Sequence, residues 1–208
     1  MITIPEAAQR ADLIVFAQRV LRLDEAAVIR LRTRADGMIG AWAATGFDVL
    51  AGRVVAGTVT PPDFTGGAEE LCRGLKEADD GGRADLGYPM DSAWRGTLPP
   101  ETGFVHLDDV PATALIEIAR QGADLAREHA GPLGPPASLL EQQVLQVSSV
   151  NDSVGVPMRC VMALAAMGFM PDTEGEIVRV RVRPGWLRID ARFGSVFGRR
   201  GDPALLLD

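Results

Sequence analysis

The same arginine-rich strand pattern occurs near both ends of this 208-residue chain. Residues 28–34 read Val-Ile-Arg-Leu-Arg-Thr-Arg, and residues 177–183 read Ile-Val-Arg-Val-Arg-Val-Arg. Because successive side chains of a strand point to opposite faces of a sheet, each copy places three arginines on one face and apolar or β-branched residues on the other. The apolar face is suited to covering a core, and we expect the arginines to face solvent.

The composition is that of a globular protein and limits its partners. Hydrophobic residues make up 47 % of the chain, enough for one good core or two small ones. No apolar run approaches the ~18 residues of a membrane span, and the start does not read as a signal peptide, so we expect a cytoplasmic protein. The net charge of −7 argues against general attraction to nucleic acid or to an anionic membrane.

The charges are unevenly distributed. Residues 101–176 hold eleven acidic residues and three arginines, whereas residues 177–200 hold seven arginines and a single acid, Asp190. Lys76 is the only lysine among the 21 basic residues, so part of the arginine richness reflects a compositional bias. The C-terminal region is therefore a basic segment in an acidic chain, although arginine alone is a weak functional signal.

Residues 1–60 are predicted to form a helix followed by three antiparallel strands. Thr3 and Glu6 have the spacing of a helix capping box, and an apolar stripe follows them. The first arginine strand then turns, returns through 38–45, and is followed by a third extended run at 47–59.

Residues 61–104 change character and are predicted to form an acidic connector. Pairs of prolines and glycines punctuate this stretch, which has room for one short helix at about 67–78. We expect Trp94 and the prolines at 99–100 to act as a rigid strap that pins the connector to the core.

Residues 105–208 are predicted to form three helices followed by the second arginine hairpin. The first helix enters at Asp109-Val110-Pro111, and the second begins with a capping box from Ser138 to Glu141 and continues through Val147. The third starts at Pro157 and is apolar nearly all round, which is typical of a buried helix.

The chain is therefore predicted to be an α+β protein with two helix-plus-antiparallel-hairpin units and a helical middle section. Residues 6–45 and 157–193 follow the same order of helix, strand, turn and strand. We interpret them as a pseudo-repeat, arising by duplication or by a pseudo-twofold arrangement within one chain. The alternative is that any two amphipathic hairpins look alike at this level.

Two clusters could carry chemistry, and each also has a simpler structural role. His106 lies next to Asp108 and Asp109, which could bind a metal or orient a general base, but Asp109 also fits the start of a helix. The run Ser148–Ser153 is rich in hydroxyl, amide and carboxylate groups, which also commonly end one helix and begin the next. We assign no catalytic, cofactor-binding or metal-binding residue.

The two cysteines, Cys72 and Cys160, do not have the spacing of a metal site. Cys160 lies in an apolar helical run, where a thiol usually acts as a small hydrophobic side chain, so we expect no structural disulfide.

The large aromatic residues of the two hairpins suggest an interaction surface. Strand parity places Trp42 and Trp186 on the same face as small, polar or arginine residues. Either these rings belong to a partner-binding surface or the connector covers them. The candidate interaction face consists of Arg30, Arg32, Trp42, Arg179, Arg181, Trp186 and Arg188.

One segment resembles a known family. The run 94–100, Trp-Arg-Gly-Thr-Leu-Pro-Pro, with Gly103-Phe104 and Val110-Pro111 shortly after it, is similar to a pattern in an uncharacterised family of actinobacterial proteins of about this size. The preference for arginine over lysine is also similar to theirs. The resemblance implies a bacterial cytosolic origin, and it brings no activity and no catalytic residues.

Three functions are consistent with these observations. The first is a non-enzymatic interaction or scaffold protein that binds a protein partner or associates with itself as a homodimer. The second is a winged-helix nucleic-acid binder whose arginine hairpin is the wing, although its third helix offers only Arg159 to read bases. The third is an enzyme that holds a small anionic substrate with arginines, for which no base or nucleophile can be identified.

Overall fold

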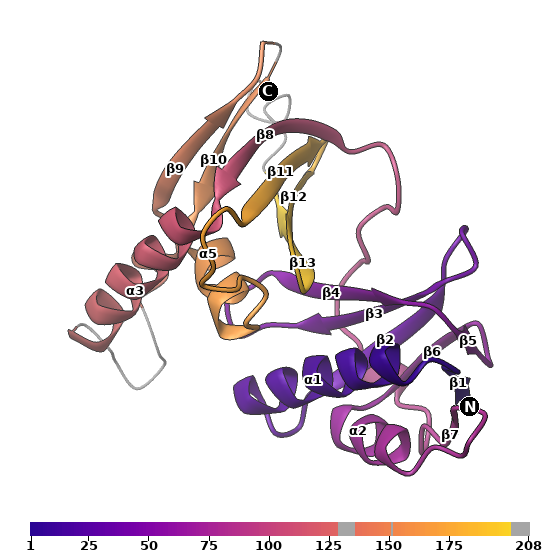
Figure 1. Cartoon of the computed structure of the whole chain (residues 1–208). Helices are drawn as coiled ribbons and strands as arrows, with labels where there is room; N and C mark the ends of the chain where they lie inside the picture. The colour runs from indigo at the N-terminus through magenta and orange to yellow at the C-terminus, as the bar shows by residue number, and fades with distance from the viewer. Residues whose placement is uncertain (129–135, 151, 201–208) are drawn as a thin grey trace. The chain divides into compact units, whose positions relative to one another are not determined.

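The computed structural model describes residues 1–128, 136–150 and 152–200 and divides into two compact units. Unit 1 comprises Met1–Gly46 and Leu50–Glu101, and unit 2 comprises Phe47–Val49 and Thr102–Asp208. Each unit combines α-helices with antiparallel sheets, which confirms the predicted α+β class (Figure 1).

Unit 1 has two α-helices that pack together on a four-stranded sheet. Its elements are β1 (Ile2–Thr3), α1 (Ala7–Leu23), β2 (Val28–Thr33), β3 (Ile39–Ala44), β4 (Leu50–Val55), β5 (Thr58–Val59), β6 (Asp63–Gly67), α2 (Ala68–Lys76), β7 (Arg83–Ala84) and the 3-10 turn η1 (Asp91–Ala93). The larger sheet has the order β6-β2-β3-β4 and the smaller one β5-β1-β7, with all pairs antiparallel. Helices α1 and α2 lie side by side (Figure 1).

Unit 2 has a related arrangement. Its described elements are β8 (Val105–Pro111), α3 (Ala112–Glu128), α4 (Ala137–Glu141), β9 (Gln143–Ser148), β10 (Ser153–Pro157), α5 (Met158–Ala166), β11 (Ile177–Arg183), β12 (Trp186–Ala191) and β13 (Gly194–Arg199). Four of its strands form an antiparallel sheet in the order β8-β11-β12-β13, and β9 and β10 form an antiparallel pair. Helices α3 and α5 contact each other, and α5 also packs on β13.

The two units share one connectivity rule. Each unit has two long helices, α1 and α2 in unit 1 and α3 and α5 in unit 2. The strand that leads into either helix of a unit pairs with the first strand that follows the other helix of that unit. In unit 1, β6 precedes α2 and pairs with β2, while β1 precedes α1 and pairs with β7. In unit 2, β8 precedes α3 and pairs with β11, while β10 precedes α5 and pairs with β9. The predicted repeats therefore occupy equivalent places, because α1-β2-β3 and α5-β11-β12 are both a helix followed by an antiparallel meander.

The alternation of the arginine strands sorts their side chains as predicted. Ile29 and Leu31 of β2 are each 1 % exposed, and β11 buries Val178, Val180 and Val182 to a similar extent. Between these residues, the arginines of both strands are exposed or half-buried. Full burial of a Leu or Ile side chain is worth about 1.5–3 kcal/mol, so these apolar faces provide much of the adhesion between sheet and helices.

The region between the hairpins contains more strand than predicted. The short helix expected at about 67–78 is α2, and the first helix of the second half is α3. The predicted second helix is wrong beyond Glu141, because residues 143–148 form β9. Gln143–Ser148 pairs with Ser153–Pro157 in a hairpin, and this backbone pairing outweighs the helical pattern of the sequence. The middle section is therefore not purely helical, and its topology is not that of a winged helix.

Two helix starts also differ from prediction. Thr3 does not cap α1, because its backbone belongs to β1 and pairs with Thr58 and Arg83. Asp109 does not begin α3, because it lies inside β8 opposite Arg179. In both cases a strand precedes the helix, so the backbone at the predicted cap is extended and already paired.

Residues 61–104 supply β6, α2, β7 and η1 to unit 1. The segment around η1 covers the outer edge of β6, where Met90 N donates to Thr65 O at 2.7 Å and Thr65 N donates to Asp91 Oδ1 at 3.1 Å. The Trp94 ring lies 5.8 Å from the Arg30 guanidinium carbon. These contacts hold the strap that the sequence predicts around Trp94 on the sheet.

Helix α5 is the buried helix that the sequence predicts. Cys160 and Leu164 are fully buried, and Met158 and Met167 are nearly so. Both cysteines of the chain are free thiols in the interior. Burial raises the pKa of the Cys160 thiol to about 12. Within the described ranges, no helix has the length and apolar character needed to cross a bilayer.

Candidate interaction surface

The outer face of the large unit 2 sheet carries five arginines, which we call the arginine face. They are Arg179, Arg181, Arg183, Arg188 and Arg199, and they come from β11, β12 and β13. Strand register places Arg181 opposite Arg188 and places both Arg183 and Arg199 opposite Trp186. The residues that alternate with them, including Val180 and Ile189, point into the core. The sheet therefore fixes these arginines on one surface.

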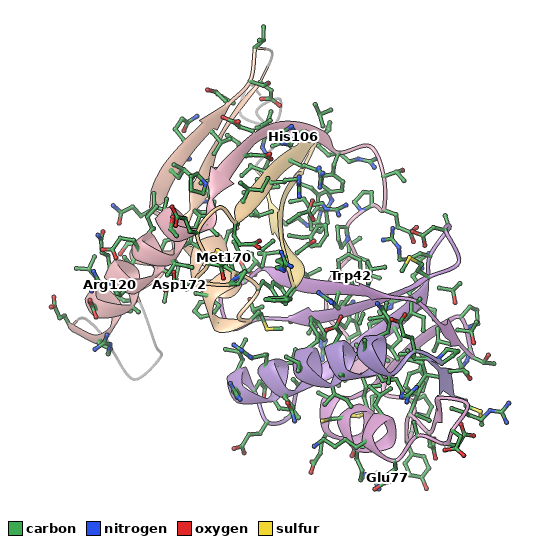
Figure 2. The ribbon with its side chains drawn as sticks, viewed as in Figure 1. Trp42, Glu77, His106, Arg120, Met170 and Asp172 are labelled. Carbon is green, nitrogen blue, oxygen red and sulfur yellow. The ribbon has the colours of Figure 1, made fainter. Side chains whose placement is uncertain are left out.

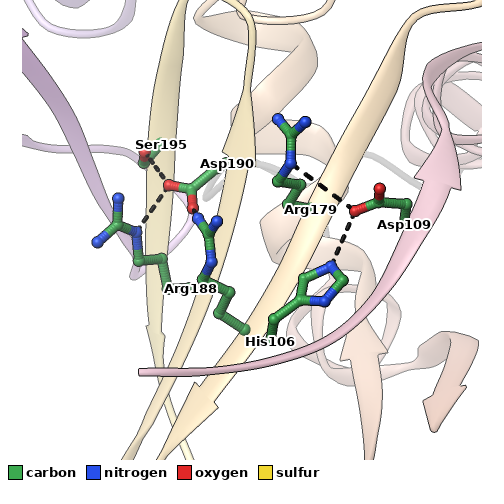
Figure 3. Close-up of polar contacts among 7 residues, drawn as sticks. His106, Asp109, Arg179, Arg188, Asp190 and Ser195 are labelled. Carbon is green, nitrogen blue, oxygen red and sulfur yellow. Dashed lines mark hydrogen bonds and ion pairs between the residues drawn. The ribbon is translucent and has the colours of Figure 1, made fainter. Parts of the chain in front are cut away.

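Asp190 is the centre of the arginine face (Figure 3). Its carboxylate accepts hydrogen bonds from Arg181 Nη1, from Ser195 Oγ and from Arg188 Nε, the last at 2.7 Å. The Asp190 side chain is only 13 % exposed. One carboxylate thus orders two guanidinium groups that would otherwise repel each other across the strand pair.

Arg188 is also held by aromatic rings. Its guanidinium carbon lies 5.6 Å from the ring centroid of Phe104 and 5.4 Å from that of Phe197. The two rings meet edge to face, with centroids 6.1 Å apart. Cation–π contacts of this kind restrict a long side chain and add a modest stabilisation. The middle of the arginine face is therefore rigid.

The other three arginines of this face have neutral partners or a distant carboxylate. Arg183 Nη1 donates to Thr102 O at 2.6 Å, and the Arg199 guanidinium lies 4.0 Å from the Trp186 ring centroid. Arg179 reaches Asp109 Oδ1 only at 3.9 Å and is 49 % exposed. These three arginines surround the ordered centre and face solvent.

His106 joins the edge of the arginine face. His106 Nε2 lies 2.9 Å from Asp109 Oδ1, the same oxygen that faces Arg179 (Figure 3). The His106 side chain is 48 % exposed and that of Asp109 is 38 % exposed, so the group lies on an open surface (Figure 2). In the described part of the chain, no set of three or more His, Cys, Asp or Glu residues is arranged to hold a metal ion.

The first arginine strand has a different electrostatic environment. Arg30 forms two hydrogen bonds of 2.7 Å to Asp63, and Arg34 pairs with Asp36. The hydrogen bond to Arg30 lowers the pKa of Asp63. The cations of this face are thus mostly neutralised by carboxylates of their own unit.

Both tryptophans lie on the outer faces that strand parity predicts, and both rings are buried. Trp42 and Trp186 are each 6 % exposed. Trp42, labelled in Figure 2, lies over Gly40, where a Cβ atom would come within 2.9 Å of its Nε1. Trp186 lies beneath Arg199. Neither ring is free to serve as an exposed aromatic anchor for a partner.

The structure groups the predicted face residues by unit. Arg30 lies opposite Trp42 in unit 1, and Arg181 lies opposite Arg188 in unit 2. Sequence reasoning missed Asp190 as a shared acceptor and missed the whole of β13. A sequence signal for β13 was present in the pair Val196-Phe197, two residues that favour strands, between Gly194 and Gly198.

The Ser148–Ser153 cluster is part of the β9–β10 hairpin. Ser149 N donates to Asp152 O at 2.8 Å, and Ser153 N donates to Asp152 Oδ1 at 2.8 Å. Asn151 lies outside the described residues. The described groups therefore bond to one another between two strands, and the expectation that they end one helix and begin the next is wrong.

The described residues also form shallow grooves away from this face. One of about 300 Å³ lies between α1 and α2 beside Cys72, one of about 190 Å³ is lined by Val28 and Trp94, and one of about 270 Å³ is lined by Leu125 and Leu139. None of their linings includes His106 or an arginine of the arginine face.

Comparison with solved structures identifies the fold. The chain is similar to the DNA polymerase sliding clamp of Bacillus subtilis, with a TM-score of 0.59 and 14 % identity, covering 100 % of this chain and 67 % of the clamp. It is similar to a putative DNA polymerase III β subunit of Eubacterium rectale, with a TM-score of 0.57 and 13 % identity over 97 % of this chain and 64 % of that one. The chain is also similar to the DNA polymerase sliding clamp of Caulobacter crescentus, with a TM-score of 0.55 and 15 % identity, covering 95 % of this chain and 66 % of the clamp.

These likenesses establish a sliding-clamp-like fold, and the chain spans about two thirds of the length of the clamps it matches. No curated protein matches it. Residues 1–96 match the family model described as domain of unknown function DUF8010, a range that lies within unit 1 apart from residues 47–49. Residues 99–203, about half of the chain, match a second model, and the chain therefore belongs to the family described as domain of unknown function DUF8185.

Proposed function

We propose that this chain is a protein-binding scaffold that associates with a partner protein or with a second copy of itself and catalyses no reaction. The arginine face of unit 2 carries the proposal, because it is an ordered cationic surface on a chain with a net charge of −7. Side chains already fixed by neighbours lose little freedom on binding, which favours association.

The sliding-clamp likeness supports a role based on association. The matched proteins are named as a DNA polymerase sliding clamp and as a putative β subunit of DNA polymerase III, which are names for parts of an assembly. At 13–15 % identity the likeness concerns the fold. Partners are set by surface residues and not by fold, so they must be sought in this chain's own charges.

The charge distribution favours a protein partner over nucleic acid. A nucleic-acid surface needs several uncompensated cations that follow the phosphate backbone. On α3, Arg120 pairs with Glu117 at 2.8 Å and Arg127 pairs with Asp124, so this helix is self-neutralised. On the arginine face, Asp190 interrupts the cations and would repel a continuous run of phosphates.

Affinity capture combined with sedimentation velocity tests this proposal. The tagged full chain is incubated with untreated and with nuclease-treated lysate of its source organism, and captured proteins are quantified against a tag-only control. The purified chain is sedimented in parallel over a range of concentrations. We expect either one or a few enriched proteins or a concentration-dependent dimer.

A chain that remains monomeric and enriches no protein overturns the proposal. Enrichment that disappears on nuclease treatment also overturns it, because the contact is then bridged by nucleic acid. Substitution of Trp42 or Trp186 is unsuitable as a probe of the surface, because both rings are buried and their removal would disturb the sheet.

A further inference from the structure

We infer that the arginine face of unit 2 binds an extended acidic segment of a partner protein. This inference rests on the proposed function and names the chemistry of the partner. The segment would lie across β11, β12 and β13, with its Glu or Asp side chains on the outer arginines.

The arginine face has more cations than its own acids can satisfy. Asp190 serves Arg181 and Arg188 together, and Asp109 is shared between His106 and Arg179. Among the described residues, no carboxylate forms an ion pair with Arg183 or Arg199. Outer cations without carboxylates, around a neutralised centre, are suited to an anionic ligand supplied by a partner.

The spacing of the outer arginines matches an extended peptide. Arg183 and Arg199 lie on either side of β12 in one cross-strand row, which separates their backbones by about 10 Å. Arg179 and Arg183 lie four residues apart on β11, which corresponds to about 13 Å. An extended segment presents side chains on one side about every 7 Å, so alternate acidic residues can reach these positions.

The floor of the arginine face is preorganised for this contact. Ser195 and Arg188 hold Asp190, and Phe104 and Phe197 hold the Arg188 guanidinium. The Arg199 guanidinium carbon lies 4.0 Å from the Trp186 ring centroid, a cation–π contact that restricts this side chain. The outer arginines therefore stand on fixed supports.

The same geometry discriminates against nucleic acid. Guanidinium groups bind phosphate as readily as carboxylate, but a nucleic acid strand carries a charge at every nucleotide and cannot avoid Asp109 and Asp190. A protein segment can carry a neutral residue at any position of the side that meets the sheet, so its acidic side chains can lie on the outer arginines while neutral ones lie over the two aspartates. An acidic protein segment is therefore the ligand that this face fits.

Fluorescence anisotropy tests the inference with defined probes. The full chain is titrated at low salt into fluorescein-labelled peptides of alternating Glu and Ser, alternating Gln and Ser, and alternating Lys and Ser, and into a single-stranded oligonucleotide of similar length. The variant is Arg183→Glu combined with Arg199→Glu. The control is Arg32→Glu, a single charge reversal at an exposed arginine on the unit 1 sheet. Circular dichroism and thermal unfolding check that each variant is folded.

We expect the Glu-Ser peptide alone to bind, with an affinity that falls as salt rises. The double variant should weaken binding by about tenfold or more, and Arg32→Glu should change it by less than about twofold. Equal weakening by both variants, no binding of the Glu-Ser peptide, or tighter binding of the oligonucleotide overturns the inference. A partner captured equally well by the double variant also overturns it while leaving the proposed function intact.

Discussion

Arg30 and Asp63 lie on the neighbouring strands β2 and β6 and join through two parallel hydrogen bonds of 2.7 Å. The Arg30 guanidinium also faces the Trp94 ring of the strap. One arginine thus connects the sheet, its edge strand and the segment that covers this edge. Among the described residues of β8, the edge neighbour of β11 in unit 2, no carboxylate forms an ion pair with Arg181 or Arg183.

The Arg30–Asp63 pair should make stability depend on pH. Because the pKa of Asp63 is lowered in the folded state, the pair stabilises the protein above the ordinary Asp pKa of about 3.9 and is lost as the pH falls through the folded value. Asp63→Asn should cost about 0.2–1 kcal/mol at pH 7, since Asp63 is 40 % exposed. Urea unfolding at several pH values measures the difference, which should vanish in acid.

Asp80→Asn, at an exposed position of the same unit, is the control for this prediction. It should leave the free energy of unfolding within about 0.5 kcal/mol of wild type at every pH. A difference between wild type and Asp63→Asn that persists unchanged at the lowest pH would contradict the prediction.

Adjacent residues of β2 should differ sharply in their effect on stability. Leu31 is 1 % exposed, so Leu31→Ala should lower the free energy of unfolding by about 2–5 kcal/mol. Arg32 is exposed, so Arg32→Ala should change the free energy of unfolding by no more than about 0.5 kcal/mol. Chemical denaturation of the two variants compares them directly. Similar losses from both would show that the strand does not sort its side chains by alternation.

Asp190→Asn should destabilise unit 2, because the two arginines then lose the charge that keeps them together. We expect a loss of about 1–3 kcal/mol, as for other partly buried charged hydrogen bonds. The comparison variant is Asp109→Asn, which is 38 % exposed and should cost less than about 1 kcal/mol. Thermal unfolding of both variants shows which substitution destabilises the protein more. A larger loss of stability for Asp109→Asn would be inconsistent with Asp190 as the centre of the arginine face.

The Cys160 thiol should be unreactive in the folded protein. Burial raises its pKa to about 12, so almost no thiolate exists at neutral pH and reagents cannot reach the sulfur. In a Cys72→Ser background, labelling by a thiol reagent should therefore follow global unfolding, and the same protein in denaturant should label at once. Rapid labelling under native conditions would show that α5 is not packed as described.

The parts of the fold that the sequence predicts best are those with a strong local period. The two arginine strands, α1, α2 and the buried α5 all follow from alternation or from an apolar helical pattern. The sequence does not predict β8, because its partner β11 lies far away in the chain. It does not predict β9 either, because the partner strand β10 begins in a polar segment that reads as a connection between helices. The exchange of strands between the two halves of each unit is likewise non-local.

The candidate site was only partly predictable for the same reason. Alternation places Arg179, Arg181 and Arg188 on one face, but it does not show that Asp190 accepts from two of them. Alternation also places Trp42 and Trp186 on the outer face. It does not show that the Trp42 ring packs against Gly40 or that Arg199 lies over the Trp186 ring. Register across strands decides these contacts, and register comes from the folded sheet.

The most direct test of this account is the arginine side-chain NMR spectrum of the full chain, recorded during titration with the Glu-Ser peptide. Each arginine Nε–Hε pair gives its own signal, which single Arg→Lys variants assign. The account predicts that Arg179, Arg183 and Arg199 shift with a common affinity while Arg30 and Arg32 stay fixed. Shifts that are equal across both units, or that are confined to unit 1, would contradict it.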